Sequence, residues 1–314
     1  MTTQNPTEEG FIPYQIPLTD KPCSTYYKVF GDLTKATPLV CLHGGPGAGH
    51  DYMLAFAELW PRYGIPVVFY DHIGCGSSTH FQGTVDDKSL WQESLFTNEL
   101  ENLLDHLQIG SAYHLLGHSW GGMIAPTFAA TQPRGLRKLV LASGIPSKKH
   151  SIRSFAQLKK ELPEKHQQAI DEAVQTRDFE SAGYKAAFGY LVRYYLCRTD
   201  VPPPEMLASY KKMAEDNTVL LATSGPSPYY QNGTFLEWSC VERLHRIAAP
   251  TLIYNAEFDT SSRDIAQMPF FELIPKVRWV KFMEAGHSVH LESEELKEKV
   301  LKLVGEFLVE QSAD

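Results

Sequence analysis

Short apolar runs recur along the first half of the chain and alternate with longer stretches in which apolar residues are spaced as on one face of a helix. A short apolar run bounded by turn residues is typical of a buried strand, whereas the stretch from Trp91 to Leu107 has the spacing of an amphipathic helix. Residues 12–31 alternate and contain prolines, which predicts antiparallel strands leading into the sheet. The four runs that we predict to be buried strands are residues 38–42, 67–70, 112–116 and 138–142. This alternation indicates an α/β fold with a mostly parallel central sheet and helices on both faces.

The second half of the chain begins with a long segment that lacks strand-like runs. Residues 145–238 have helical spacing, which predicts a helical cap inserted into the sheet. Two more apolar runs, residues 251–256 and 278–282, predict the last two strands, and residues 292–308 predict a closing amphipathic helix. A chain of 314 residues is long enough for one such core with one cap. The expected core consists of residues 1–144 and 239–314.

The sequence Gly-His-Ser-Trp-Gly, at residues 117–121, lies between a predicted strand and the small apolar stretch 123–130. The predicted order is therefore strand, sharp turn, helix. A G-x-S-x-G turn of this kind exposes its serine beyond the end of a strand, and its glycines are needed because side chains there would collide with the neighbouring strand and helix. Ser119 is therefore the candidate nucleophile.

A glycine-rich loop, His-Gly-Gly-Pro-Gly at residues 43–47, directly follows another predicted strand. Without side chains in the way, backbone N–H groups of such a loop can turn toward an oxyanion that develops on a substrate carbonyl. We expect the N–H groups of Gly45 and Trp120 to form the oxyanion hole, with Gly44 as a further candidate. The alternative is that the loop is only a turn between a strand and a helix.

A nucleophilic serine needs a base, and the base needs an acid that orients it. Asp259 and His287 each lie just beyond a predicted strand, and both follow Ser119 in the chain order that α/β-hydrolases use. The carboxyl ends of parallel strands meet at one edge of a sheet, where the sites of these folds assemble. We therefore expect the three side chains to converge despite their separation in sequence.

Other histidines and acids compete for these roles. His43 and His118 flank the predicted site but are badly aimed, so we expect them to support it from behind. His290 lies three residues beyond the expected base, which the preceding glycine favours. Glu257 precedes the expected acid by two residues and would point to the same face if the strand continued.

Five short motifs are HGGPG (43–47), DHIGCGSS (71–78), GHSWGGM (117–123), EFD (257–259) and GH (286–287). Together they resemble the prolyl aminopeptidase (proline iminopeptidase) branch of the α/β-hydrolases, and the resemblance extends from about Tyr26 onward. It implies a catalytic triad of Ser119, Asp259 and His287. It also implies an oxyanion hole formed by the HGGPG loop and Trp120.

The chain departs from this branch at the positions that hold the substrate's amino terminus. The resembled aminopeptidases use one glutamate in an N-G-P-N-E-F type segment of the cap and another directly after the catalytic aspartate. Here residues 224–229 read Ser-Gly-Pro-Ser-Pro-Tyr, with Pro228 in the glutamate's place, and Thr260 follows the expected acid. An ammonium group buried without a counter-charge costs several kcal/mol. We therefore expect a free N-terminal amine to be disfavoured, unless Glu237 or Glu257 supplies a carboxylate from elsewhere.

Aromatic residues are frequent in the predicted cap. A cap above the strand ends would bring some of them over the nucleophile, where they would favour an apolar or aromatic substrate. The alternative for any one of them is that it packs the cap onto the core. The candidate substrate contacts are Tyr190, Tyr194, Tyr229, Tyr230 and Trp238.

These features predict a serine hydrolase that acts through an acyl-enzyme on a small amide or ester. A true prolyl or aminoacyl aminopeptidase, or an amino-acid amidase, is the alternative within the same chemistry. The alternative of another class is a ligand-binding protein of this fold with little turnover, although such a protein has no need of a complete set of catalytic residues. The residue types do not decide between hydrolysis and acyl transfer or cyclisation.

The composition limits the partners. A net charge of −8 without a basic stripe argues against nucleic acid or an anionic membrane as partner, so a small molecule or a short peptide-like compound is expected. The five cysteines lack metal-ligand spacing, and no metal or cofactor is expected. The first residues resemble no secretory signal, and no apolar run is long enough to span a membrane. Together with reduced thiols, this favours a cytoplasmic location.

Overall fold

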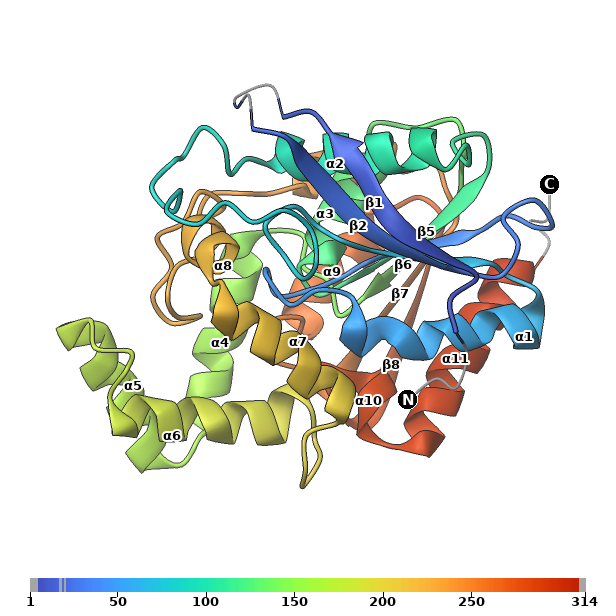
Figure 1. The fold of residues 1–314 in the computed structure, drawn as a ribbon. Helices are drawn as coiled ribbons and strands as arrows, with labels where there is room; N and C mark the ends of the chain where they lie inside the picture. The colour runs from blue at the N-terminus through green and yellow to red at the C-terminus, as the bar shows by residue number, and fades with distance from the viewer. Residues whose placement is uncertain (1–4, 17–18, 20, 311–314) are drawn as a thin grey trace.

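The computed structural model describes residues 5–16, 19 and 21–310, and in it eight strands form one twisted sheet (Figure 1). The strand order is β1-β2-β4-β3-β5-β6-β7-β8. β2 pairs antiparallel with β1 on one side and with β4 on the other, and all other neighbours are parallel. The strands are β1 (Glu8–Tyr14), β2 (Cys23–Phe30), β3 (Leu39–Leu42), β4 (Val67–Asp71), β5 (Tyr113–His118), β6 (Leu136–Ala142), β7 (Thr251–Phe258) and β8 (Val277–Gly286). The predicted mostly parallel α/β sheet is confirmed.

Helices cover both faces of this sheet, and each face has its own apolar cluster. The central strands β3 to β6 are buried along almost their whole length, because both of their faces pack against helices. One cluster lies under α2 (Glu93–His106), α3 (Gly121–Ala129), α9 (Asp264–Leu273) and the 3₁₀ helix η3 (Val241–Arg246). The other lies under the 3₁₀ helix η1 (Asp51–Glu58), α1 (Leu59–Tyr63), α10 (Val289–Glu292) and α11 (Glu294–Val309).

The segment between β6 and β7 is helical, as its spacing predicts. Four of its helices share a small apolar cluster, and Figure 1 shows α5 and α6 extending away from the sheet. We refer to residues 145–238 as the insertion. Its helices are α4 (Lys148–Glu161), α5 (Glu164–Thr176), α6 (Ala182–Leu191), the π-helical η2 (Val192–Leu196), α7 (Pro204–Glu215) and α8 (Thr218–Thr223).

The insertion contacts the core at several points. The ammonium of Lys212 on α7 lies 2.6 Å from Asp51 on η1, and His80 Nδ1 lies 2.6 Å from Asp216. The backbone N–H of Tyr52 donates to Ser209 Oγ at 3.3 Å. These contacts tie α7 and the turn after it to the loops at one edge of the sheet.

The predicted strands and helices occur where the apolar runs lie, but some are longer. The last strand continues from Phe282 to Gly286 because its backbone keeps pairing with β7. The first strand, β1, begins at Glu8, four residues before the stretch that was predicted to form antiparallel strands. Along the described part of the chain, no helix is both long and apolar enough to cross a membrane.

Candidate active site

Ser119 sits at the turn between β5 and α3 with a backbone φ of +54°, a conformation that non-glycine residues rarely adopt. The Ser119 N–H donates to the carbonyl of Ala142 at the end of β6, which fixes the turn against the sheet. Gly121 is required there, because a Cβ on it would lie 2.2 Å from the carbonyl oxygen of Leu42. The structure thus holds a strained serine beyond the end of a central strand, as the motif predicts.

Asp259 and His287 lie side by side because the strands that precede them are paired. Phe258 on β7 is opposite Gly286 on β8, and the next residue of each strand is the candidate acid or base. His287 Nδ1 donates to Asp259 Oδ1 at 2.7 Å, and the carboxylate is fully buried. This bond leaves Nε2 as the ring nitrogen available to a nucleophile.

The carboxylate of Asp259 is itself held in place by two further donors. Ser143 Oγ donates to Oδ2 at 2.8 Å, and the backbone N–H of Ser262 donates to Oδ1 at 3.1 Å. These bonds orient the carboxylate toward His287 and compensate for its burial. Sequence reasoning missed Ser143, since nothing distinguishes it from any other small residue at a strand end.

The backbone of His287 is anchored to the insertion. Its N–H donates to the carbonyl of Tyr195 at 2.9 Å, and the N–H of Ser288 donates to the carbonyl of Leu196 at 2.8 Å. The partly buried carboxylate of Glu292 accepts from the N–H groups of Gly286 and Arg198, so it also joins α10 to the insertion. The position of the candidate base therefore depends on where the insertion lies.

A chain of buried hydrogen bonds joins the HGGPG loop to the candidate base. The N–H of Gly44 donates to Tyr52 Oη at 2.6 Å, and that hydroxyl donates to His118 Nδ1 at 2.8 Å. His118 Nε2 in turn donates to the carbonyl of His287 at 3.2 Å. Burial lowers the pKa of His118 well below its usual value, so the ring is neutral; its proton is on Nε2, which faces a carbonyl, and Nδ1 accepts from Tyr52.

This chain corrects one expectation about the oxyanion hole. The amide of Gly44 is already bonded to Tyr52, so it is not free to donate to a substrate oxygen. The N–H groups of Gly45 and Trp120, by contrast, have no acceptor within the described residues. Gly44 nevertheless lies against the nucleophile, since a Cβ on it would be 2.8 Å from Ser119 Cβ.

His43 supports the loop from behind, as expected. The N–H of His72 donates to its Nε2 at 3.0 Å, and its Nδ1 donates to the carbonyl of Gly44 at 2.8 Å. Burial lowers the pKa of His43 to about 3, which keeps the ring neutral.

The two competing residues are engaged elsewhere. His290 Nε2 donates to the carbonyl of Tyr52 at 3.0 Å. The carboxylate of Glu257 accepts from the N–H of Glu284 at 2.8 Å, so it binds the backbone of the neighbouring strand β8. The structure therefore pairs Asp259 with His287 and places neither competitor in that pair.

Three of the tyrosines expected to contact substrate pack against other residues of the insertion instead. The rings of Tyr190 and Tyr194 contact each other in a tilted arrangement with 4.4 Å between centroids, and Tyr194 is 38% exposed. Tyr230 stacks on Phe179 and lies under the guanidinium of Arg177. None of these contacts involves the candidate triad, so packing within the insertion accounts for them.

The other two aromatic candidates lie closer to the core. Trp238 Nε1 donates to Glu93, and its ring centroid is 6.2 Å from that of Phe235, which lies 6.3 Å from Trp120. Tyr229 packs on α4, and its buried hydroxyl has no partner in the part of the chain described.

The positions at which the resembled aminopeptidases carry glutamates hold Pro228 and Thr260, and Glu237 was a possible substitute. Thr260 is buried, Glu237 is exposed, and Pro228 is partly buried. Each fully or nearly fully buried carboxylate already accepts hydrogen bonds from protein groups. These are Asp71, Glu99, Asp216 and Asp259.

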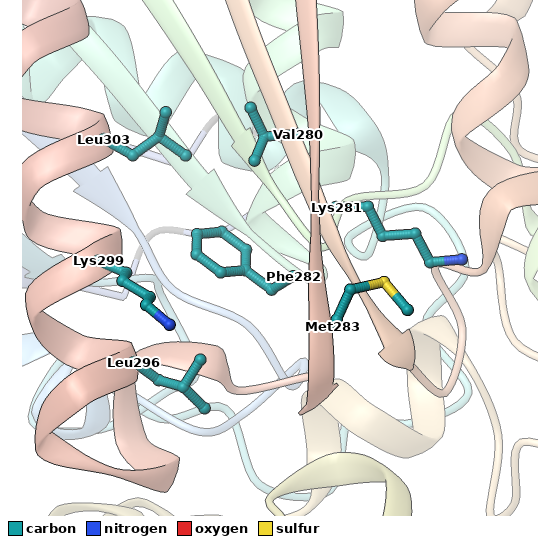
Figure 2. A pocket seen from close by; sticks show the side chains of 7 residues that line it. All are labelled: Val280, Lys281, Phe282, Met283, Leu296, Lys299 and Leu303. Carbon is teal, nitrogen blue, oxygen red and sulfur yellow. The ribbon is translucent and has the colours of Figure 1, made fainter.

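A surface groove of about 420 Å³ lies away from this site, between β8 and α11 (Figure 2). Figure 2 shows Phe282 and Leu303 facing each other across it, with Lys299 at its rim. No residue of the candidate triad lines it.

All five cysteines are buried and free, and burial raises the pKa of the Cys75 thiol well above its usual value. A thiol with a raised pKa is a poor nucleophile, so Cys75 is not expected to be reactive.

Known proteins are similar to this chain in sequence and in architecture. Residues 37–294 match the alpha/beta hydrolase fold family. A proline iminopeptidase of Levilactobacillus brevis is 32% identical over 289 residues, which cover 91% of this chain and 92% of the relative. One of Saccharolobus solfataricus is 30% identical over 286 residues, covering 90% and 88%.

Solved structures agree with these relatives. The crystal structure of VinJ superposes with a TM-score of 0.89 at 34% identity and covers 97% of this chain and 100% of its own. The proline iminopeptidase of Mycobacterium smegmatis superposes with a TM-score of 0.84 at 30% identity, covering 96% and 97%. The fold is that of an α/β-hydrolase. The chain belongs to the α/β-hydrolase family and, within it, to the branch of the proline iminopeptidases.

Proposed function

We propose that the protein is a serine hydrolase that forms an acyl-enzyme on Ser119. The observation that carries this proposal is the shared location of a strained serine, a buried Asp259–His287 pair and two backbone amides without acceptors. A protein that only binds a ligand has no need of this combination.

The reaction would proceed in two halves. His287 Nε2 takes the hydroxyl proton of Ser119 while Oγ attacks the substrate carbonyl, and Asp259 stabilises the imidazolium that forms. The N–H groups of Gly45 and Trp120 donate to the oxyanion, each contributing roughly 3 kcal/mol. The imidazolium then gives its proton to the departing amine or alcohol. Water, deprotonated by the same nitrogen, attacks the acyl-enzyme and releases the acid.

We infer further that the substrate is a small, partly apolar or aromatic amide or ester without a free N-terminal amine. Support comes from Pro228 and Thr260, which stand where the resembled aminopeptidases carry glutamates, and from the engagement of the buried carboxylates. An ammonium taken into this site would therefore lack a counter-charge. The insertion, acting as a cap, would exclude water above Ser119.

The names of the relatives favour a second candidate, hydrolysis of an N-terminal prolyl or other aminoacyl bond. The two candidates are separated by assaying proline p-nitroanilide and other aminoacyl arylamides beside N-capped arylamides and p-nitrophenyl esters. We expect the uncharged compounds to be cleaved with the higher kcat/KM. Efficient cleavage of proline p-nitroanilide that N-capping abolishes would show instead that another acid holds the amine.

Ser119→Ala is the control for both candidates. A fluorophosphonate probe should label the wild-type chain and leave the variant unlabelled. A folded wild-type chain that resists labelling and hydrolyses nothing in the panel would contradict the proposed hydrolase and favour a binding function.

A further inference from the structure

Lys148, the first residue of α4, is a buried lysine without a counter-ion. Its side chain turns inward, the residue is only 6% exposed, and Nζ donates to Ser224 Oγ at 3.0 Å. No carboxylate of the described residues lies within ion-pair distance of it. An ammonium carries three N–H donors, so a single hydroxyl leaves most of its hydrogen-bonding capacity unused.

The chain contains a second buried lysine, which shows what a structural role looks like. Lys138 Nζ donates to the backbone carbonyls of Phe307 and Glu310 at the end of α11, where carbonyls have no helical partner. It thereby closes the C-terminus of that helix. Lys148 has no comparable acceptors. Burial is the single cause that lowers its pKa, to about 8, so the charged form still prevails at pH 7.

The surroundings of Lys148 are also polar where apolar packing is expected. The buried residues in the first two turns of α4 are all polar: Lys148, Ser151 and Ser154. Within the described residues, Ser154 Oγ is buried without a partner. The ring of Phe155 contacts Tyr229, whose buried hydroxyl also lacks a partner in that part of the chain. Buried polar atoms without partners are uncommon in native proteins and call for an explanation.

This polar side of α4 adjoins the candidate active site. The N–H of Lys148 donates to the carbonyl of Trp238 at 3.0 Å, and the Trp238 ring reaches Trp120 through Phe235. In the chain α4 follows β6, and the bond from Lys148 to Ser224 joins the start of α4 to the residue after α8. Five residues before Lys148, Ser143 bonds to Asp259.

We propose that Lys148 Nζ binds a carboxylate on the acyl part of the substrate, with Ser224 Oγ beside it. The inference rests on the proposed hydrolase function and narrows its substrate to acyl groups that carry a distal carboxylate. A single ammonium with one neighbouring hydroxyl suits a monoanion. The rings of Trp238 and Phe235 pack between the backbone of Lys148 and Trp120, so an acyl group that extends from Ser119 toward Lys148 would meet aromatic side chains, and its middle part is apolar.

A matched series of substrates tests this. We would measure kcat/KM for the mono-p-nitrophenyl esters of succinate, glutarate and adipate, and for the butyrate, valerate and hexanoate esters of equal length. Three lengths are used because the best spacing between the two carbonyl carbons is the unknown. We expect at least one carboxylated ester to be preferred by tenfold or more in the wild-type chain, as one charge-assisted hydrogen bond provides.

Lys148→Met supplies the comparison, with Lys149→Met as matched control. Lys149 is the next residue, is exposed, and its replacement changes the net charge equally. Lys148→Met should reduce kcat/KM for the carboxylated ester at least tenfold through KM, change the methyl-terminated ester by less than threefold, and still be labelled by a fluorophosphonate. Lys149→Met should resemble the wild type. Equal losses on both esters would assign Lys148 a structural role, and no loss on either would remove it from the site.

Inhibition of the wild-type chain gives an answer even if Lys148→Met does not fold. Glutaramate and adipamate, each with one amide and one carboxylate, should inhibit hydrolysis of a methyl-terminated ester at least tenfold more strongly than glutaramide and adipamide. Equal inhibition would overturn the carboxylate site while leaving the hydrolase intact. Failure of every ester and of fluorophosphonate labelling would instead overturn the proposed function on which the site depends.

Discussion

The hydroxyl of Tyr52 lies 2.8 Å from Nδ1 of His118 and joins the HGGPG loop to this histidine through hydrogen bonds. It accepts from the Gly44 N–H and donates to the ring, so one oxygen sets both the position of the loop and the tautomer of His118. Because His118 then donates to the carbonyl of His287, the loop, the nucleophile turn and the candidate base form one rigid unit.

Tyr52→Phe should therefore destabilise the protein and impair it at the same time. The change leaves the Gly44 N–H and His118 Nδ1 buried without partners, which costs about 3 kcal/mol in the free energy of unfolding. We expect kcat to fall more than KM rises, since the loop that carries the oxyanion donors is loosened. Urea unfolding and ester hydrolysis measure the two effects.

Tyr63→Phe is the control for this change. Tyr63 packs its ring against Gly305 on α11, and its hydroxyl makes no hydrogen bond within the described residues. It should lose little stability and no activity. If the two variants lost the same free energy of unfolding, the hydrogen bonds of the Tyr52 hydroxyl would not stabilise the protein as predicted.

Asp259→Asn tests the acid of the proposed triad. An amide in this place no longer holds the proton on His287 Nδ1 or stabilises the imidazolium, so we expect kcat to fall by about 10³ to 10⁴. Ser143→Ala, which removes one of the donors to the carboxylate, should cost roughly tenfold. Steady-state kinetics on one ester gives both values.

The competing acid provides the comparison. Glu257→Gln keeps an oxygen that can accept from the Glu284 N–H, so it should change kcat less than twofold. A large loss in Glu257→Gln together with a small loss in Asp259→Asn would reverse the assignment.

The site could be predicted from sequence where a residue's role follows from its position at a strand end. Ser119, Asp259 and His287 each follow a recognisable apolar run, and the parallel order of the strands brings such ends together. The residues at which the strands end could not be predicted from the sequence in the same way. Nothing in the letters after Phe282 shows that β8 continues to Gly286, and that continuation puts His287 opposite Asp259.

Residues whose role depends on three-dimensional contacts could not be found in this way. Tyr52 reads as an ordinary core aromatic, because its partners lie in two other segments of the chain. Lys148 and Lys149 are identical letters, and only the orientation of α4 buries one and exposes the other. The sequence favours Gly45 for the oxyanion hole and keeps Gly44 as a further candidate, and only the bond from the Gly44 N–H to Tyr52 removes the latter.

Gly44→Ala should damage activity without any direct contact with substrate. A Cβ at this position would lie 2.8 Å from both Ser119 Cβ and Tyr52 Oη, so the loop has to move away from the nucleophile. Oxyanion donors act only when they are aimed at the developing charge, and we expect kcat to fall at least 10²-fold. Rates of fluorophosphonate labelling and of ester hydrolysis should fall together.

Gly189→Ala is the matched control for that substitution. Gly189 lies within α6, its Cβ would meet nothing within 4 Å, and alanine favours a helix by about 1 kcal/mol over glycine. We expect unchanged kinetics and slightly higher stability. A Gly44→Ala variant with wild-type kcat would show that the loop has room to adjust.

Stability should fall as the solution is acidified below pH 6.5, because several histidines are buried in the neutral form. Burial lowers the pKa of His72 to about 3 and of His290 to about 4, whereas in the unfolded chain they bind protons near pH 6.5. The unfolded state therefore gains protons first, and each such histidine removes roughly 1 kcal/mol per pH unit between 6.5 and its folded pKa. Glu99 acts in the opposite direction, since burial raises its pKa to about 8, but it is one group against several histidines. His290→Gln should reduce the loss of unfolding free energy between pH 7 and pH 5 by about 2 kcal/mol. The same substitution at the exposed His245 is the control and should leave that loss unchanged. If the wild type and both variants lost the same free energy of unfolding, other groups would govern acid unfolding.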